Sequence, residues 1–201
     1  MTDPSDKARA EIRARMQAKL AAMSDEERHE ASSAACTRLA GLEVFKHAGL
    51  VMLYMPLAGE VDTTSLAIRC FQMGKTVCVP RMDWKRKDLN AVEVTGFDDH
   101  VMETDEHGLR SPRGGRPVVP ESIDLVVVPA LAFDTQGNRV GRAGGYFDRF
   151  LLRLKRSAVS VGLAFDGQII DAAPVSERHV RLDVIVTDRR VSHARRSRSR
   201  R

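Results

Sequence analysis

The sequence predicts a three-layer α/β/α domain with a largely parallel β-sheet. Short runs rich in valine and isoleucine alternate with helical patterns along most of the 201 residues. Strands of a parallel sheet are buried on both faces, so they read as short apolar runs. Alternation of such runs with helices is typical of a sheet that helices cover on both faces. A hydrophobic content of 43% is enough for the core of one such domain.

Two helices are predicted before the first strand. Residues 7–23 place an apolar stripe on one side of a helix, formed by Ile12, Met16, Leu20 and Met23. Ser24 and Glu27 have the spacing of a capping box, in which each side chain accepts a hydrogen bond from the other residue's backbone N–H. A second helix is therefore expected to begin there and to run to about Leu39, before Gly41.

Strands and helices then alternate toward the C-terminus. The expected strands cover residues 50–54, 76–79, 91–94, 123–128, 159–163 and 182–187, and Pro80 is expected to close the second of them. Helices are expected at residues 63–73, followed by Gly74, and from about Gly145. Residues 96–121 are rich in polar residues, proline and glycine, so they predict a long surface loop that could cover the site.

The net charge of +5 comes from the C-terminus. Residues 189–201 contain seven arginines and no acidic residue, so the rest of the chain is slightly acidic. We therefore expect one domain over residues 1–188 and a disordered, arginine-rich tail over residues 189–201, which could hold polyanions loosely. This location of the charge argues against specific binding of nucleic acid. A nucleic-acid-binding protein that acts through the tail is the alternative from another functional class.

Other functional classes are disfavoured by what the sequence lacks. No apolar run approaches the ~18 residues of a membrane-spanning helix, and the polar N-terminus is unlike a signal peptide. Cys36, Cys70 and Cys78 show no C-x-x-C spacing, so we expect reduced, packed thiols, a cytoplasmic location and no membrane partner. The histidines have no metal-binding spacing and stand in no motif of a hydrolytic triad.

A glycine-rich segment, N-R-V-G-R-A-G-G-Y-F-D at residues 138–148, follows the strand expected at residues 123–128, where ligands of α/β sheets usually bind. Its glycines let backbone N–H groups turn toward an anion, its arginines add positive charge, and its aspartate can bind a cation. These residues are Gly141, Gly144, Gly145, Arg139, Arg142 and Asp148. The segment predicts a nucleotide-phosphate site with a metal ion, and a glycine-rich turn with solvated arginines is the alternative. It matches neither the Walker-type P-loop nor the dinucleotide fingerprint.

Four segments in order give the chain a more specific resemblance. They are Y-M-P-L-A-G-E-V-D-T at 54–63, G-K-T-V-C-V-P-R at 74–81, the run at 126–151 that contains the glycine-rich segment, and L-D-V-I-V-T at 182–187. Together they resemble the 5-formyltetrahydrofolate cyclo-ligase family over residues 12–187. The resemblance implies an α/β/α fold that is Rossmann-like, of the NagB/RpiA/CoA-transferase type.

The same resemblance implies an activity. Family members use Mg²⁺, and ATP as a co-substrate, to convert 5-formyltetrahydrofolate into 5,10-methenyltetrahydrofolate, with release of ADP and phosphate. The formyl oxygen attacks the γ-phosphate, and N10 closes the resulting iminium phosphate with loss of phosphate. Such a phosphoryl transfer depends mainly on positioned cations. The expected protein is a monomer whose partners are ATP and 5-formyltetrahydrofolate, including its polyglutamylated forms. A divergent paralogue or fold relative that acts on another small phosphorylated or CoA-linked substrate stays open.

The resemblance also implies site residues. The implied contacts of ATP come from the first helix and the glycine-rich segment, and they are Arg9, Arg13, Arg139, Val140, Gly141, Arg142, Ala143, Gly144, Gly145, Tyr146 and Phe147. Arg142 and Tyr146 are the implied catalytic residues, and Asp148 and Asp183 are the implied ligands of Mg²⁺. The implied folate contacts are Met55, Glu60 and Tyr146, of which the carboxylate can accept hydrogen bonds from the donor-rich edge of a pterin.

Several candidates have simpler explanations. Asp183 can merely begin a strand, and Glu60 can merely precede the cap of a helix. Trp84, the sole tryptophan, follows a strand and could bind substrate by stacking on the pterin or benzoyl ring, or it could be a core residue. The charges at residues 85–87 could attract a polyglutamate chain or could simply be solvated.

The sequence departs from the family pattern at five positions. Arginine replaces lysine at Arg9, alanine replaces glycine at Ala143, phenylalanine replaces tyrosine at Phe147, valine replaces aspartate at Val180, and serine replaces glutamate at Ser111. If residue 143 needs a positive φ, alanine there costs ~1 kcal/mol. Without the resemblance, Arg9 and Arg13 would be interpreted as exposed helix charges. These departures leave the phosphate and metal residues largely in place, and they are the reason why a divergent paralogue with another substrate stays open as the alternative.

Overall fold

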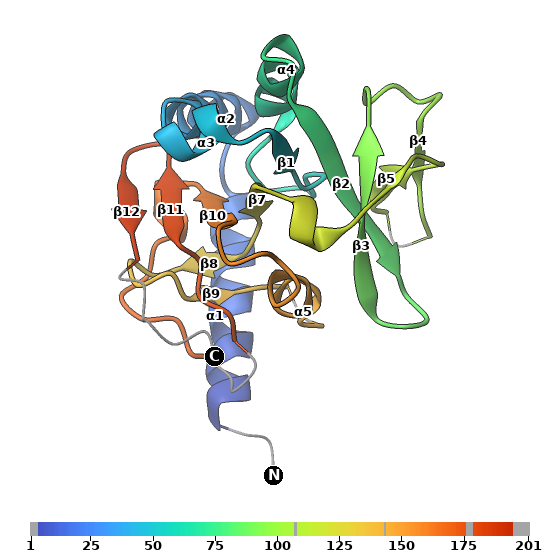
Figure 1. The fold of residues 1–201 in the computed structure, drawn as a ribbon. Coiled ribbons are helices and arrows are strands. Elements are labelled where there is room, and N and C mark those ends of the chain that lie inside the picture. The colour runs from blue at the N-terminus through green and yellow to red at the C-terminus, as the bar shows by residue number, and fades with distance from the viewer. Residues whose placement is uncertain (1–3, 107, 143, 176–178, 195–201) are drawn as a thin grey trace.

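The computed structural model describes residues 4–106, 108–142, 144–175 and 179–194 (Figure 1). Eight strands form the main sheet in the order β12-β11-β10-β7-β1-β2-β3-β6. Its central strands, from β11 to β2, are parallel, whereas β12, β3 and β6 pair antiparallel at the edges, so the predicted largely parallel sheet is confirmed. The strands of this sheet are β1 (Leu50–Met52), β2 (Thr76–Asp83), β3 (Asp88–Val94), β6 (Pro117–Val118), β7 (Leu125–Val128), β10 (Val159–Ala164), β11 (Val184–Thr187) and β12 (Val191–His193).

Helices cover both faces of this sheet, which confirms the predicted three layers (Figure 1). One face carries α1 (Pro4–Ala21), α2 (Asp25–Ala40), α3 (Glu43–His47) and α4 (Thr64–Gln72), and the other face carries α5 (Tyr146–Leu151). Neighbouring residues of one strand serve different cores, since Val51 belongs to the core under α1 to α4 and Met52 to the core under α5. Because side chains alternate along a strand, the consecutive apolar residues of β7 fill both cores.

The predicted N-terminal helices and their capping box are confirmed. Met16 and Leu20 of α1 are buried. The backbone N–H of Glu27 donates to the Ser24 hydroxyl at 3.1 Å, and the backbone N–H of Ser24 donates to the Glu27 carboxylate at 2.8 Å. α4 lies within the predicted residues 63–73, whereas the short α3 was not predicted.

The second predicted strand is longer than expected, because Pro80 does not end it. β2 continues through Pro80 and pairs with β3 from Val77 to Asp83. The carbonyl of Cys78 accepts a hydrogen bond from the backbone N–H of Leu53, so the backbone nitrogens of residues 78 and 80 point toward β1. β1 ends at Met52, opposite Cys78, so the proline removes no hydrogen bond from the sheet.

Residues 96–121 contain strands where a surface loop was predicted. β4 (Met102–Thr104) pairs with β5 (Arg110–Pro112), and β6 extends the main sheet beside β3. The hairpin lies beside β2 (Figure 1) and buries Met102 and Ser111. The prediction of one long loop was wrong, because strands of two or three residues carry too short a pattern to detect. A 3₁₀ turn, η1 (Pro120–Ser122), leads from β6 into β7.

The predicted boundary between domain and tail was also wrong. β12 lies inside the segment expected to be disordered and pairs with β11. Arg190 forms an ion pair with Asp166, at an N–O distance of 2.6 Å. Asp166 belongs to the 3₁₀ turn η2 (Asp166–Gln168), which follows β10. The ordered domain therefore extends to at least Ala194, and residues 195–201 lie outside the described part of the chain.

The three cysteines are buried and free, as the sequence predicted. Burial raises the pKa of Cys36 and Cys70 to about 11 and that of Cys78 to about 12, so these thiols stay protonated near neutral pH. Over the residues that the structure describes, no helix is long and apolar enough to cross a membrane.

Candidate active site

The strand order reverses between β1 and β7, and this position locates the candidate site. From β1 the chain continues to β2 on one side, whereas from β7 it continues to β10 on the other side. In open α/β sheets, ligands bind outside the carboxyl ends of the strands at such a reversal. Glu60 follows β1, and the glycine-rich segment follows β7 through the hairpin of β8 (Ala132–Phe133) and β9 (Arg139–Val140).

A buried carboxylate, Asp134, fixes the turn of this hairpin. Its Oδ1 accepts hydrogen bonds from the backbone N–H groups of Gln136 and Asn138, both at 2.9 Å. Its Oδ2 accepts one from the Asn138 amide at 2.8 Å and one from the backbone N–H of Ala173 at 3.0 Å. This turn was not predicted from the sequence, although an aspartate three residues before a glycine is a recognisable signal. Asp134 thereby holds the segment that enters the glycine loop.

Two glycines of the loop are required by its conformation. Gly144 and Gly145 have φ angles of +82° and +63°, which favour glycine. A Cβ atom on Gly144 would also lie 2.5 Å from the ring of Tyr146. Gly141 has neither a positive φ nor a close neighbour, so the backbone does not require glycine there. Ala143, the expected site of strain, lies outside the described residues.

Arg142 joins the glycine loop to the predicted folate residue Glu60. Its Nε donates to the Glu60 carboxylate at 2.9 Å, and its terminal nitrogen donates to the carbonyl of Ala58 at 3.2 Å. The second carboxylate oxygen of Glu60 accepts from the backbone N–H of Leu57 at 3.0 Å. The Glu60 side chain is only 6% exposed, whereas that of Arg142 is 35% exposed. Two residues that are 82 positions apart, predicted separately for folate and for phosphate, thus lie in contact.

A cavity of about 480 Å³ opens beside this ion pair. It is lined by Arg142, by Gly59 and by Gln17 of α1, among others. The predicted phosphate residues Arg9 and Arg13 lie on the same stripe of α1 as Gln17, about two helical turns and one helical turn away, respectively. Arg9 donates to the side chains of Ser5 and Asp6, and Arg13 is half-buried.

Arg139 contacts Asp148 rather than open solvent. Its side chain is 4% exposed and donates to Asp148 Oδ1 at 2.8 Å and to the carbonyl of Val180 at 2.6 Å. Burial lowers the pKa of Arg139, while the Asp148 carboxylate acts in the opposite direction. Asp148 Oδ1 also accepts from the backbone N–H of Val180 at 3.0 Å and lies 3.6 Å from Nδ1 of His179. Arg139, a predicted phosphate contact, therefore forms a buried network with Asp148, a predicted metal ligand.

The second predicted metal ligand, Asp183, bridges β10 and β11. Its Oδ2 accepts hydrogen bonds from the backbone N–H of Ser160 at 2.9 Å and from the Ser160 hydroxyl at 2.8 Å. Among the described residues no group of three or more His, Cys, Asp or Glu side chains is placed to hold a metal ion. The geometry therefore fits Mg²⁺ only where one carboxylate acts together with phosphate and water ligands, as is common for this ion. Asp148, 25% exposed and adjoining the glycine loop, has the better position for that role.

Trp84 lies at the surface, so its interpretation as a core residue was wrong. It follows β2, is 36% exposed, and donates from its indole N–H to Asp105 at 2.9 Å. Its ring meets the ring of Tyr146 edge to face, with centroids 5.8 Å apart. Two predicted substrate residues are thus brought together beside the loop. Met55, another predicted substrate residue, is buried in the core under α1 to α4.

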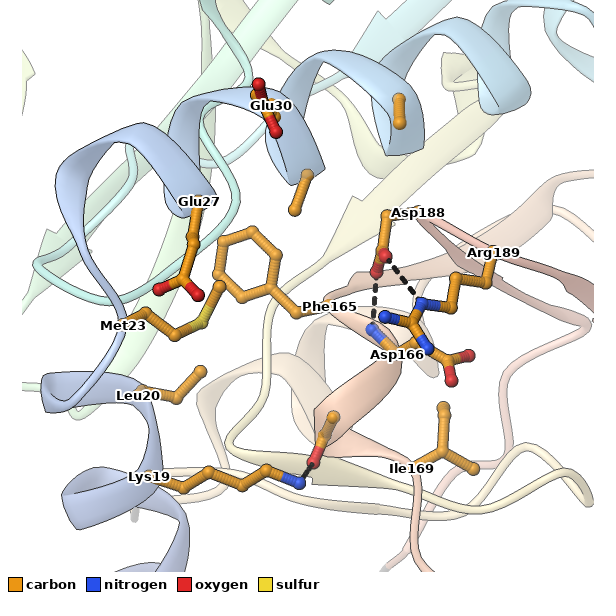
Figure 2. A pocket seen from close by; sticks show the side chains of 13 residues that line it. Lys19, Leu20, Met23, Glu27, Glu30, Phe165, Asp166, Ile169, Asp188 and Arg189 are labelled. Atoms are coloured by element: carbon orange, nitrogen blue, oxygen red, sulfur yellow. Dashed lines mark hydrogen bonds and ion pairs between the residues drawn. The ribbon is translucent and has the colours of Figure 1, made fainter.

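A larger cavity of about 740 Å³ lies beyond the carboxyl ends of β10 and β11 (Figure 2). Figure 2 shows Lys19 of α1 reaching across it, and its ammonium donates to the carbonyl of Gly167 at 2.7 Å. Asp166 and Asp188 line it at the strand ends. None of the predicted site residues that the structure describes lines this cavity, so the candidate site remains at β1 and β7.

Comparison with known proteins gives the same family throughout. The 5-formyltetrahydrofolate cyclo-ligase of Mus musculus is 25% identical to this chain, and the match covers 87% of this chain and 91% of the mouse protein. That of Escherichia coli strain K12 is 29% identical, and the match covers 85% of this chain and 94% of the bacterial protein. The NMR structure of Aquifex aeolicus 5,10-methenyltetrahydrofolate synthetase superposes with a TM-score of 0.82 at 31% identity, and the match covers 96% of each chain. The family profile of 5-formyltetrahydrofolate cyclo-ligase matches residues 5–188. The chain therefore belongs to the 5-formyltetrahydrofolate cyclo-ligase family.

Proposed function

We propose that the protein converts 5-formyltetrahydrofolate into 5,10-methenyltetrahydrofolate at the expense of ATP, with release of ADP and phosphate. Membership of the cyclo-ligase family supports the conversion. The single observation that carries the assignment of the site is the contact between Arg142 and Glu60. It brings a glycine loop suited to phosphate and a carboxylate suited to a pterin edge together at the reversal point of the sheet.

In the proposed reaction Arg142 leaves Glu60 and turns to the phosphates of ATP. Its partly exposed guanidinium can make this movement, whereas the buried Glu60 stays in place through the backbone N–H of Leu57. The freed carboxylate oxygen then accepts hydrogen bonds from the pterin. Arg142 meanwhile stabilises the charge that develops as the formyl oxygen takes the γ-phosphoryl group. Tyr146 and the backbone N–H groups of the glycine loop contact the ATP phosphates together with Arg142.

Mg²⁺ would neutralise charge between the β- and γ-phosphates when bound. We propose Asp148 as its carboxylate ligand, because the hydrogen bonds that Asp148 accepts from the described residues all end on Oδ1. Asp183 enters this proposal through the resemblance alone, since its bonds to Ser160 already explain it as a bridge between strands. Arg9 and Arg13 complete the phosphate contacts in the same proposal.

The proposal also covers the location and oligomeric state of the protein and the polyglutamate chain of its folate substrate. We propose a cytoplasmic location, because both substrates are soluble metabolites and the cysteines are free thiols. We also propose that the protein is a monomer. The exposed charges at residues 85–87 lie beside Trp84 in the turn between β2 and β3. Three adjacent cationic side chains would attract the carboxylates of a polyglutamate chain.

Absorbance of the methenyl product tests the proposal. Protein mixed with 5-formyltetrahydrofolate should form product with ATP and Mg²⁺, and should form none when ATP is omitted. Arg142→Lys keeps the positive charge but loses the planar guanidinium with its several N–H donors, so it should lower the rate by at least about tenfold. As a matched control, Arg110→Lys alters an exposed pair with Asp99 outside the loop and should stay within about twofold of the wild type. Product formation without ATP would contradict the proposed reaction.

A further inference from the structure

Arg149, in the middle of α5, contacts both sides of the candidate site. Its guanidinium donates to the carbonyl of Gly144 in the glycine loop at 2.8 Å. A second nitrogen donates to the carbonyl of Lys87, in the turn that joins β2 to β3. Its central carbon also lies 5.0 Å from the centre of the Tyr146 ring. One planar group thus holds the loop, the turn and the aromatic ring together.

The contact with Gly144 determines the direction in which the peptide group between Gly144 and Gly145 points. The N–H and C=O of one peptide group point in opposite directions. Because Arg149 holds the Gly144 carbonyl on its own side, the N–H of Gly145 in the same peptide plane points to the other side. The Tyr146 ring lies over Gly144 so closely that a Cβ there would be 2.5 Å from it. Arg149 therefore fixes the orientation of this peptide together with that of the ring.

The contact with Tyr146 extends this effect to Trp84. Tyr146 meets Trp84 edge to face, and Trp84 stands at the end of β2. A guanidinium stacked on an aromatic face is attracted by the ring and restricts its rotation. The position of Lys87, whose φ is +51°, is held by the same side chain. Movement of the loop would consequently move the aromatic pair.

Arg153, four residues after Arg149 and just beyond the end of α5, is a natural control for Arg149. It also stacks on a ring three residues before it, with 5.1 Å to the centre of Phe150. It also reaches the start of β3, where it donates to the Asp88 carboxylate and to the carbonyl of Leu89. Among the described residues these contacts include none with the glycine loop. Both arginines attach α5 to the sheet, and only Arg149 holds the loop.

We propose that Arg149 is a positioning residue that holds the glycine loop and the Trp84–Tyr146 pair in one arrangement, so that it couples the nucleotide part of the site to the folate part. The inference rests on the proposed function, because it assigns the loop to ATP and the aromatic pair to the folate. Arg149 itself contacts neither reacting group. Its effect is exerted through Gly144 and Tyr146.

The test compares Arg149→Lys with Arg153→Lys. Lysine keeps the positive charge but loses the planar guanidinium and its stacking on the aromatic ring. Both changes should lower thermal stability to a similar extent. Arg149→Lys should raise the KM for ATP and the KM for 5-formyltetrahydrofolate by at least about fivefold, with kcat within about threefold, whereas Arg153→Lys should leave both KM values within about twofold. Unchanged KM values in Arg149→Lys, or equal increases in both variants, would overturn the inference.

A second measurement is independent of turnover. Trp84 is the sole tryptophan, so its fluorescence reports the aromatic pair directly. In ligand-free protein, Arg149→Lys should increase quenching of Trp84 by acrylamide, and Arg153→Lys should not. If the wild type forms no methenyl product, the proposed function fails, and the quenching comparison alone then decides whether Arg149 holds the pair. Equal quenching in the wild type and Arg149→Lys would show that it does not.

Discussion

At the scale of single residues, the pair of Arg139 and Asp148 is expected to contribute to stability, because the Arg139 side chain is buried. Removing one partner of such a pair leaves a charge without compensation, which costs about 3–5 kcal/mol. With 4% of its side chain exposed, Arg139 is better placed to hold Asp148 than to bind a phosphate. The motif alone could indicate two arginines near an anion. Only the fold distinguishes the half-exposed Arg142 from the buried Arg139.

We expect Arg139→Met to lower the free energy of unfolding by about 3 kcal/mol. Lys46→Met breaks the exposed pair with Glu43 and should cost less than about 1 kcal/mol. Urea unfolding followed by circular dichroism measures both. A variant at 139 that unfolds like the wild type, but requires more ATP for its half-maximal rate, would show that Arg139 binds phosphate instead.

The cysteines give a second expectation at this scale. Their raised pKa values, about 11 for Cys36 and Cys70 and about 12 for Cys78, leave little thiolate at pH 8. A thiol reagent should therefore label the native protein at least about a hundredfold more slowly than the urea-unfolded protein. Rapid labelling of a native cysteine would contradict its burial.

Val180, one of the departures from the family pattern, contacts Arg139 and Asp148 through its backbone. It supplies its backbone N–H to Asp148 and its carbonyl to Arg139, and neither contact uses the side chain. A sequence comparison registers the loss of an aspartate at this position. It cannot register that the backbone makes these two contacts.

At the scale of elements, the position of the glycine loop was predicted from the sequence. Which of its glycines the backbone conformation requires was not predicted. Gly144 and Gly141 occur in the same motif, yet only Gly144 has a positive φ and a close neighbour. The hairpin of β8 and β9 was missed because its strands of two residues carry no periodicity. The motif residues Arg139 and Val140 therefore form a strand rather than a loop.

Two alanine variants separate the glycines. Gly144→Ala should lower the free energy of unfolding by about 1–3 kcal/mol, because it combines an unfavourable φ with a clash. Gly141→Ala should leave stability unchanged or raise it by up to about 1 kcal/mol, since it reduces the freedom of the unfolded chain. Thermal and urea unfolding test both. Equal losses in the two variants would mean that the loop adopts another conformation.

The edge strand β12 gives a prediction about truncation. Removing residues 195–201 should leave the free energy of unfolding unchanged and the turnover rate within about twofold of the full chain, because such a segment has no apolar residues to pack. Removing residues 189–201 also deletes β12 and the ion pair of Arg190 with Asp166. That truncation should cost at least about 2 kcal/mol, since it exposes the edge of β11. Two truncated proteins of equal stability would show that β12 contributes nothing.

For the whole molecule, the reversal of strand order explains why the site forms. β1 and β7 are adjacent in the sheet although 72 residues separate Met52 from Leu125. The sequence predicted six strands of the main sheet, the layers and, through the resemblance, the family. It could not predict from pattern alone which strand ends would be neighbours, because hydrophobic periodicity contains no information on strand order. The contact between Glu60 and Arg142 depends on that order.

The most direct test of the proposed reaction counts both products in the same sample. With limiting 5-formyltetrahydrofolate and excess ATP and Mg²⁺, each methenyl product should appear together with one ADP. Absorbance measures the folate product, and chromatography of the quenched mixture measures ADP. An equal yield of the two products is the predicted result. ADP without methenyl product, or methenyl product without ADP, would contradict an ATP-dependent cyclo-ligase at this site.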